Sequence, residues 1–553
     1  MELKKQELLR RFTDPAEKER DSVCVMCRAK NTKTFLFPTC RIVHSFACEG
    51  CIPEILRYEG SACSFPSCIN DNLLREEFRK TVEQHNGGAT AYTQTIDLLT
   101  LTIPGRWPKP VLLKEETVVT LKNIALSEVL LFKLLKKTHV VVGENVSVFG
   151  NFKGEDCIRA GTDFEGLRLL RPASFQEIQI SVCFMENITR MPNKSIKIGK
   201  SNRLGLPNCS INILPKLKMH EDNEMEGLEL HILKTKHISE AIRTRQNRIW
   251  LGEMKNLKLR LFAINTLHRL VLHEENEMER CFLNAEKDES IFEAILTKNN
   301  SIWLGKVNNL DLELFAISIL PKLKLHEENE MEEFSLSADK EEYVSEVTRA
   351  ENNSIYLGKV KKLELRDYAV NALPKLKLHR ENEMEKFCLN ADRIEHVSEI
   401  ILAENNSIHT GKLKNLKLWE YAINVLPKLH GENEIEELVI TGVGRGYCSN
   451  DVFSSDSDFF SWKIKRLKIE NSAVDILKIR KRQDCLLELL EFVPQKGEKF
   501  SYLKTRIFLS RIDIGKVRQD GFFVPKEIRP KLKYTLVDEK GNEVVKKKSF
   551  FIW

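Results

Sequence analysis

The sequence predicts an α/β repeat solenoid of 53-residue double repeats, preceded by a small zinc-binding module. Two observations support this prediction. First, the chain repeats itself with a constant step of 53 residues, and periods of this order indicate stacked supersecondary units. The glycines that mark the step are Gly199, Gly252, Gly305, Gly358 and Gly411. Second, seven of the 14 cysteines lie with one histidine within 45 residues near the N-terminus.

Residues 1–20 are charged, with apolar residues at helical spacing, and predict a short helix before the zinc-binding module at 21–75. The module has paired ligands whose x2 spacings are typical of zinc knuckles, so we expect two tetrahedral Zn²⁺ sites. A disulfide framework is the alternative. The eight candidate ligands are Cys24, Cys27, Cys40, His44, Cys48, Cys51, Cys63 and Cys68.

The order of these ligands, with histidine fourth, resembles the C3HC4 RING finger of E3 ubiquitin ligases. The resemblance implies a cross-brace, with Cys24, Cys27, Cys48 and Cys51 on one zinc and Cys40, His44, Cys63 and Cys68 on the other. It also implies that a ubiquitin-conjugating enzyme docks on a surface that includes Met26, Ile52 and Pro66. The sequence departs from the family in the x4 spacing of the last ligand pair. It also has Ile69 where many active ligases carry a positive charge.

A glycine pair, Gly87-Gly88, predicts a linker over 76–90, and the solenoid is expected over 91–490. Early in this region, 95–101, 140–142 and 178–182 are expected to form strands, and 124–131 to form one face of a helix. The regular repeats cover about 196–440. Residues 491–553 are richer in lysine and arginine and are expected to form a basic cap or a small domain, with strands at 534–537 and 546–553.

Each double repeat contains two units, of about 24 and 29 residues. Both begin with an apolar-x-Leu step, which marks a short strand with inward side chains at every second position. The steps are Leu310-x-Leu312 and Phe334-x-Leu336, and helical segments are expected after them, over 315–323 and 343–350.

Units of this length and pattern resemble leucine-rich repeats. Where that family has a buried asparagine at the ninth position, this chain has an aromatic or acidic residue, so an asparagine ladder is not expected there. Another α/β solenoid or an all-helical one is the alternative.

Two further features recur with the 53-residue step. The motif His-Glu-x-Asn-Glu-Met-Glu begins at His273 and His326, and returns at His379 with Arg380 in place of the first glutamate. We interpret it as a solvated turn whose methionine packs inside, with a column of cation sites as the alternative. Trp250, Trp303 and Tyr356 share one position, and packing is preferred there over ligand binding.

The composition, with a net charge of +6, points to no particular partner. No run of about 20 apolar residues suggests a membrane span, and the scattered remaining cysteines suit the reducing cytoplasm or nucleus. No motif for a nucleophile or general base is evident. The two resemblances imply a RING-type E3 ubiquitin-protein ligase or ligase-like adaptor whose solenoid binds a protein substrate. The alternative is a non-enzymatic scaffold with a purely structural finger. Nucleic-acid binding through the basic C-terminal segment is a weaker alternative.

Overall fold

In the computed structural model the chain forms two compact units. One consists of Met1–Arg203 with Asn212–Asn223, and the other consists of Leu204–Ile211 with Glu224–Trp553. Among the described residues, no helix is long and apolar enough to cross a bilayer. The described residues are 36–38, 46–48, 51, 97–101, 113–149, 158–160, 182–198, 203–219, 223–238, 248–431, 433–443, 447–448, 452, 462–471, 476–477, 486–493 and 511–544.

The described residues of the first unit form three small sheets and two α-helices. The antiparallel hairpin of β1 (Leu36–Pro38) and β2 (Phe46–Cys48) belongs to the predicted finger. The parallel sheet β3-β4-β6 is formed by Leu98–Leu101, Val118–Leu121 and His139–Val142. The third sheet has the order β11-β9-β7-β5-β8, formed by Leu217–Lys218, Ile196–Ile198, Val146–Phe149, Ile124–Ser127 and Ile158–Ala160. The helices are α5 (Glu128–Lys137) and α6 (Val182–Arg190).

The helix predicted over 124–131 is partly wrong. Its first half is strand β5, and helix α5 begins only at Glu128. Ser127 separates the two, because its side chain accepts a hydrogen bond from Leu130 N at the helix start. The β5 residues are all buried, so they lack the alternation that would identify a strand in the sequence. The strands expected at 95–101 and 140–142 are present as β3 and β6, whereas most of 178–182 lies outside the described residues.

The second unit is an α/β repeat solenoid built on one long sheet, which we call the main sheet. In the described part of the chain it has 15 strands, 13 of them in one continuous path, and every pairing from β13 to β29 is parallel. The path runs through β10 (Arg203–Pro207), β13 (Gly227–Ile232), β15 (Asn256–Leu261), β17 (Glu277–Ala285), β18 (Ile302–Leu314), β20 (Glu330–Ala338), β21 (Ile355–Asp367), β23 (Glu383–Ala391), β24 (Lys412–Glu420), β25 (Glu434–Thr441), β26 (Lys463–Glu470), β27 (Leu489–Val493) and β29 (Phe522–Phe523).

The register confirms the two units of each double repeat. Leu310 of β18 lies opposite Phe334 of β20, and Phe334 lies opposite Leu363 of β21. These partners are 24 and 29 residues apart, as the sequence predicts. Strand after strand, the same columns of leucine and phenylalanine point into the core and are buried. Cys281 takes a leucine position in one column, and burial raises the pKa of its thiol to about 12, so it acts as an apolar core residue.

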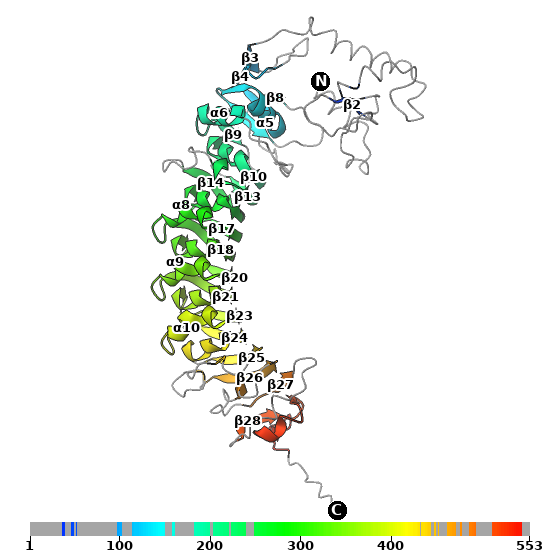
Figure 1. Ribbon diagram of the computed structural model, residues 1–553, viewed down its shortest axis with the longest axis vertical. Helices are drawn as coiled ribbons and strands as arrows, with labels where there is room; N and C mark the ends of the chain where they lie inside the picture. The colour runs from blue at the N-terminus through cyan, green and yellow to red at the C-terminus, as the bar shows by residue number, and fades with distance from the viewer. Residues whose placement is uncertain are drawn as a thin grey trace, which may run out of the picture. The chain divides into compact units, whose positions relative to one another are not determined.

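Short helices follow the strands and lie along one side of the main sheet, where α8, α9 and α10 are labelled in Figure 1. The predicted segments are confirmed in position, although the first is a 3₁₀ helix that contains a proline near its end. The helices are η5 (Thr235–His237), η6 (Phe262–Arg269), η7 (Asp288–Ser290), α8 (Phe292–Ile295), η8 (Phe315–Lys322), η9 (Glu341–Val344), α9 (Ser345–Thr348), η10 (Tyr368–Lys375), η11 (Ile394–Val397), α10 (Ser398–Leu402) and η12 (Tyr421–Lys428), while η4 (Asn208–Lys216) spans residues of both units.

Short strands close each double repeat beside the 3₁₀ helix. In the best-formed repeats β19 (Leu323–Leu325) pairs with the first residues of β18, and β22 (Leu376–Leu378) pairs with those of β21. The long strands β18 and β21 therefore belong to two ladders at once. In the double repeat before these, the equivalent pairing joins β14 (Ile249–Met254) to β16 (Leu270–Leu272), and β14 also pairs with β12 (Glu224–Met225).

A ladder of buried asparagines joins consecutive turns of the solenoid. The Asn329 side chain accepts a hydrogen bond from Val307 N at 2.7 Å and donates one to Leu357 O at 3.0 Å. Asn276 and Asn382 make the equivalent bonds one double repeat earlier and later. These are the asparagines of the His-Glu-x-Asn-Glu-Met-Glu motif, so the ladder is present at another position than the leucine-rich-repeat pattern suggests.

The 53-residue spacing of glycine has a steric cause. Gly305 has φ +81°, and a Cβ on it would lie 2.3 Å from the carbonyl oxygen of Asn276. That carbonyl accepts a hydrogen bond from Lys306 N at 2.8 Å, which requires the close approach. Only glycine fits both the positive φ and the contact.

The C-terminal part continues the main sheet through β27 and β29. Beside them, β28 (Ile512–Arg518) pairs in parallel with β30 (Leu532–Val537), and η17 (Arg529–Lys531) precedes β30. The strand expected at 534–537 is thus confirmed, whereas 546–553 lies outside the described residues.

Candidate functional site

The predicted zinc ligands lie almost entirely outside the described residues. Cys48 ends strand β2, where it pairs with Leu36 across the hairpin, and Cys51 is half-buried. The other six ligands are Cys24, Cys27, Cys40, His44, Cys63 and Cys68, and they lie outside the described residues together with the predicted docking residues Met26, Ile52 and Pro66. The zinc sites and the docking surface therefore stay predictions.

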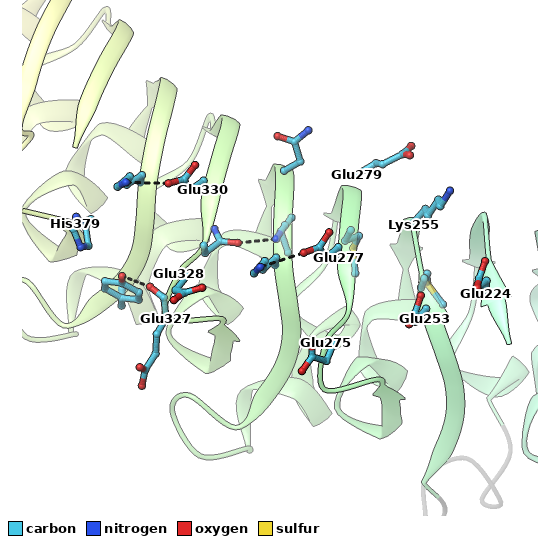
Figure 2. Close-up of a pocket in the computed structure, with 18 of the residues that line it drawn as sticks. Glu224, Glu253, Lys255, Glu275, Glu277, Glu279, Glu327, Glu328, Glu330 and His379 are labelled. Carbon is cyan, nitrogen blue, oxygen red and sulfur yellow. Dashed lines mark hydrogen bonds and ion pairs between the residues drawn. The ribbon is translucent and has the colours of Figure 1, made fainter. Parts of the chain in front are cut away.

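A groove of about 1180 Å³ runs along the solenoid, beside the ends at which β17 and β20 begin. Its lining comes from consecutive double repeats, and Figure 2 shows glutamates from the turns and the strand starts projecting along it. Nine glutamates and three lysines line the groove, an excess of six negative charges. We call it the acidic groove. Its charged residues are Glu224, Glu253, Glu275, Glu277, Glu279, Glu327, Glu328, Glu330, Glu381, Lys255, Lys306 and Lys359, with His379.

The repeated His-Glu-x-Asn-Glu-Met-Glu motif builds this groove. In each copy the asparagine N–H donates to the carbonyl oxygen of the histidine, at 3.1 Å between Asn329 and His326, which closes a tight turn. The histidine Nδ1 accepts a hydrogen bond from the residue two positions later, at 3.1 Å from Glu328 N. Histidine, asparagine and the buried Met331 thus hold the turn, and the turn glutamates are left exposed.

The lysines of the groove pair with the glutamates that begin the main-sheet strands. Lys306 Nζ lies 3.1 Å from Glu277 and Lys359 Nζ lies 2.9 Å from Glu330. The hydrogen bond from Lys359 lowers the pKa of Glu330, and the hydrogen bond to Glu277 raises the pKa of Lys306. Exposed pairs of this kind contribute little to the stability of a fold. They nevertheless neutralise the strand-start glutamates.

The turn glutamates carry the uncompensated charge. Glu275, Glu328 and Glu381 form no ion pair with any residue in the described part of the chain, and all three are exposed. Their carboxylates therefore line the groove without a cationic partner among the described residues. The solvated-turn interpretation is supported for the architecture of the motif, but it misses this collective charge. The signal was available in the sequence as glutamates repeated at the 53-residue step.

The aromatic column also packs as expected. Trp303 Nε1 donates to the His273 carbonyl at 3.3 Å, and the Tyr356 hydroxyl donates to the Glu327 carbonyl at 2.6 Å. The ring of Trp303 also meets the edge of His326, with centroids 6.2 Å apart. These contacts tie each aromatic side chain to neighbouring turns, and Tyr356 additionally lines the acidic groove.

Comparison of the chain with protein-family models, with curated proteins and with solved structures finds no match.

Proposed function

We propose that the chain is a RING-type ubiquitin ligase or ligase-like adaptor, whose leucine-rich-repeat-like solenoid binds a basic segment of a protein substrate. The leucine-rich-repeat assignment is supported by units of 24 and 29 residues, one parallel strand per unit, short helices on one side and a buried asparagine ladder. The ligase half rests on the ligand order of the N-terminal finger.

The proposal that the solenoid binds a substrate is based on the acidic groove. Its residues extend from β12, just before β13, to the turn before β23, and β13 and β23 are six strand spacings apart in the main sheet. At about 4.8 Å per spacing this is roughly 29 Å, the length of an extended segment of about nine residues. A partner with lysine or arginine at several positions would satisfy the unpaired turn glutamates, and its charge would also speed its encounter with the groove.

Charge reversal in the groove tests this proposal. The double variant Glu275→Lys, Glu328→Lys should weaken binding of a fluorescent nine-residue peptide of mixed lysine, arginine and glycine by at least about tenfold. The matched control is the double variant Glu289→Lys, Glu341→Lys, an equal change of charge on η7 and η9, at residues that do not line the groove. Binding to the parent should also weaken as salt is raised. Equal affinity for the parent and the groove variant, or equal binding of a glutamate-rich peptide, would contradict the proposal.

The ligase half has its own test. Met26 precedes the second predicted zinc ligand and is not itself a ligand, so Met26→Ala should reduce ubiquitin transfer while the zinc content stays at two. Because Ile69 lacks the positive charge found in many active ligases, Ile69→Arg should raise the activity. If the parent and Ile69→Arg are both inactive with a panel of conjugating enzymes, while zinc is bound and the peptide still binds, the scaffold alternative replaces the ligase.

A further inference from the structure

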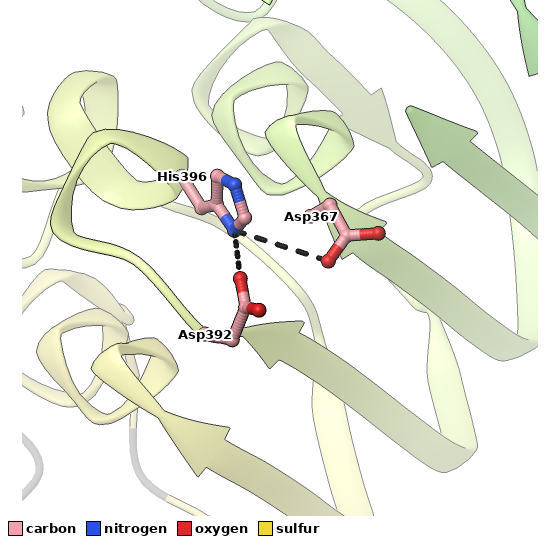
Figure 3. A group of neighbouring side chains, drawn as sticks. All are labelled: Asp367, Asp392 and His396. Carbon is pink, nitrogen blue, oxygen red and sulfur yellow. Dashed lines mark ion pairs between the residues drawn. The ribbon is translucent and has the colours of Figure 1, made fainter. Parts of the chain in front are cut away.

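A second cluster of charged residues lies at the opposite ends of the main-sheet strands from the acidic groove. Asp367 ends strand β21, Asp392 directly follows β23, and His396 belongs to η11. The Nδ1 atom of His396 lies 3.1 Å from Asp392 Oδ1 and 3.9 Å from Asp367 Oδ1. Figure 3 shows that both carboxylates face this one nitrogen.

The histidine is buried and lacks a satisfactory partner. Its side chain is 4% exposed, and Nδ1 makes no hydrogen bond of acceptable geometry despite the short distance to Asp392. Its ring packs edge-on against Tyr368, with centroids 4.4 Å apart, which holds the nitrogen toward the two carboxylates. An orphaned buried nitrogen between two carboxylates is costly unless something binds it.

The carboxylates around His396 are crowded. Burial raises the pKa of Asp367, His396 lowers it, and the weaker effects of Asp392 and Asp339 raise it again. On the next strand, burial and the charge of Asp392 also raise the pKa of Glu420. The acidic neighbours of the cluster, Asp339, Glu395 and Glu420, outnumber the basic ones, Arg366 and Arg393, so a bound cation would reduce the repulsion among the carboxylates.

Comparison with the preceding double repeat shows what is particular to this cluster. In the preceding repeat, the position of Asp367 is occupied by Leu314 and that of His396 by Tyr343. The position of Asp392 is occupied by another aspartate, Asp339. Tyr343 makes the same edge-on ring contact with Phe315, also at 4.4 Å. The preceding repeat thus has an apolar residue and an aromatic ring at these two places, whereas the next repeat has Glu420 at the position of Asp367. One repeat has instead acquired a carboxylate and an imidazole nitrogen that face each other.

We propose that Asp367, Asp392 and His396 bind one divalent transition-metal ion, with Zn²⁺ the best-matched cation. One imidazole nitrogen and two carboxylate oxygens form a donor set that zinc accepts, and water would complete a tetrahedron. The three ligand atoms lie within 4.8 Å of one another. A tetrahedral ion at about 2.1 Å from each atom spaces them about 3.4 Å apart. The 3.1 Å between Asp392 and His396 is close to this spacing, and Asp367, at 3.9 Å from the same nitrogen, would move slightly closer on binding the ion.

The internal repeat supplies matched variants for the test. His396→Tyr and Asp367→Leu install the residues of the preceding repeat, and both should fold. The converse double variant, Leu314→Asp with Tyr343→His, builds a second copy of the cluster around Asp339. Zinc per chain is measured on the full-length protein by equilibrium dialysis and elemental mass spectrometry. Millimolar Mg²⁺ is included to suppress non-specific binding to carboxylates.

The parent should bind one zinc ion more than His396→Tyr or Asp367→Leu, and the converse double variant one more than the parent. The zinc of the N-terminal finger is common to all four proteins and cancels in these differences, so the result does not depend on the proposed ligase function. Equal zinc content in the parent and in both single variants, with unchanged circular dichroism, would overturn the proposal. Should a single variant unfold, the double variant decides, because failure to gain an ion also contradicts the site.

Discussion

Replacing Asn329 with alanine is expected to loosen the solenoid locally by about 2–4 kcal/mol. The substitution removes the acceptor for Val307 N and the donor to Leu357 O, both in buried residues. A buried polar group left without a partner costs about 1–3 kcal/mol, and water that enters the vacated space recovers part of the cost of two such groups. Since about 1.4 kcal/mol corresponds to a tenfold change, the Val307 amide should exchange about thirty- to a thousandfold faster in the variant.

Native-state hydrogen exchange followed by mass spectrometry measures this effect directly. Glu328→Ala is the matched control, because it lies one residue away in the same turn and is exposed; it should change local stability by less than about 0.5 kcal/mol. Amides several repeats away, such as those of β26, should be unaffected, since a solenoid is held by nearest-neighbour contacts. If Val307 exchanges at the same rate in both variants, the ladder does not stabilise the turns and the reasoning is wrong.

Three further predictions concern the repeats and the finger. Gly305→Ala should lower the local free energy of unfolding by at least about 2 kcal/mol more than Gly541→Ala does. Both glycines have positive φ, but only at Gly305 would a Cβ lie against a backbone carbonyl. Equal losses of stability, measured by hydrogen exchange, would argue against the close approach. Leu310→Asp should destabilise the fold by more than about 3 kcal/mol through a buried unpaired charge, whereas His326→Ala should cost less than about 1 kcal/mol; a thermal melt of Leu310→Asp that matched the parent would refute its buried position. The fragment 15–80 should bind two zinc ions and unfold when a chelator removes them, and native mass spectrometry that finds one zinc or none would exclude the cross-brace.

The repeat itself was predictable because the same residue types recur in the sequence at a constant step of 53 residues. The leucine columns lie in register at spacings of 24 and 29 residues, as expected. The asparagine ladder was missed although its residues recur just as regularly. Asn276, Asn329 and Asn382 stand among glutamates, and a polar context suggests a solvated turn. Only the stacking of the next strand buries these side chains.

The mistaken helix at 124–131 has a related cause. The residues of β5 are buried on both faces, so their apolar run has neither the period of a strand nor that of a helix. Ser127 is the one local signal of the true boundary, because it is a favourable residue at a helix start.

The sequence by itself determined the length of the repeats, the strand positions, the core columns and the candidate ligands of the finger, because each depends on residues close together or copied at one step. The tertiary structure decided which of the charged residues lie side by side. The acidic groove and the Asp367–Asp392–His396 cluster join residues from different turns of the solenoid. Parallel strands about 4.8 Å apart bring side chains that are 24 or 29 positions apart in the chain into neighbouring places, and no local pattern records that distance.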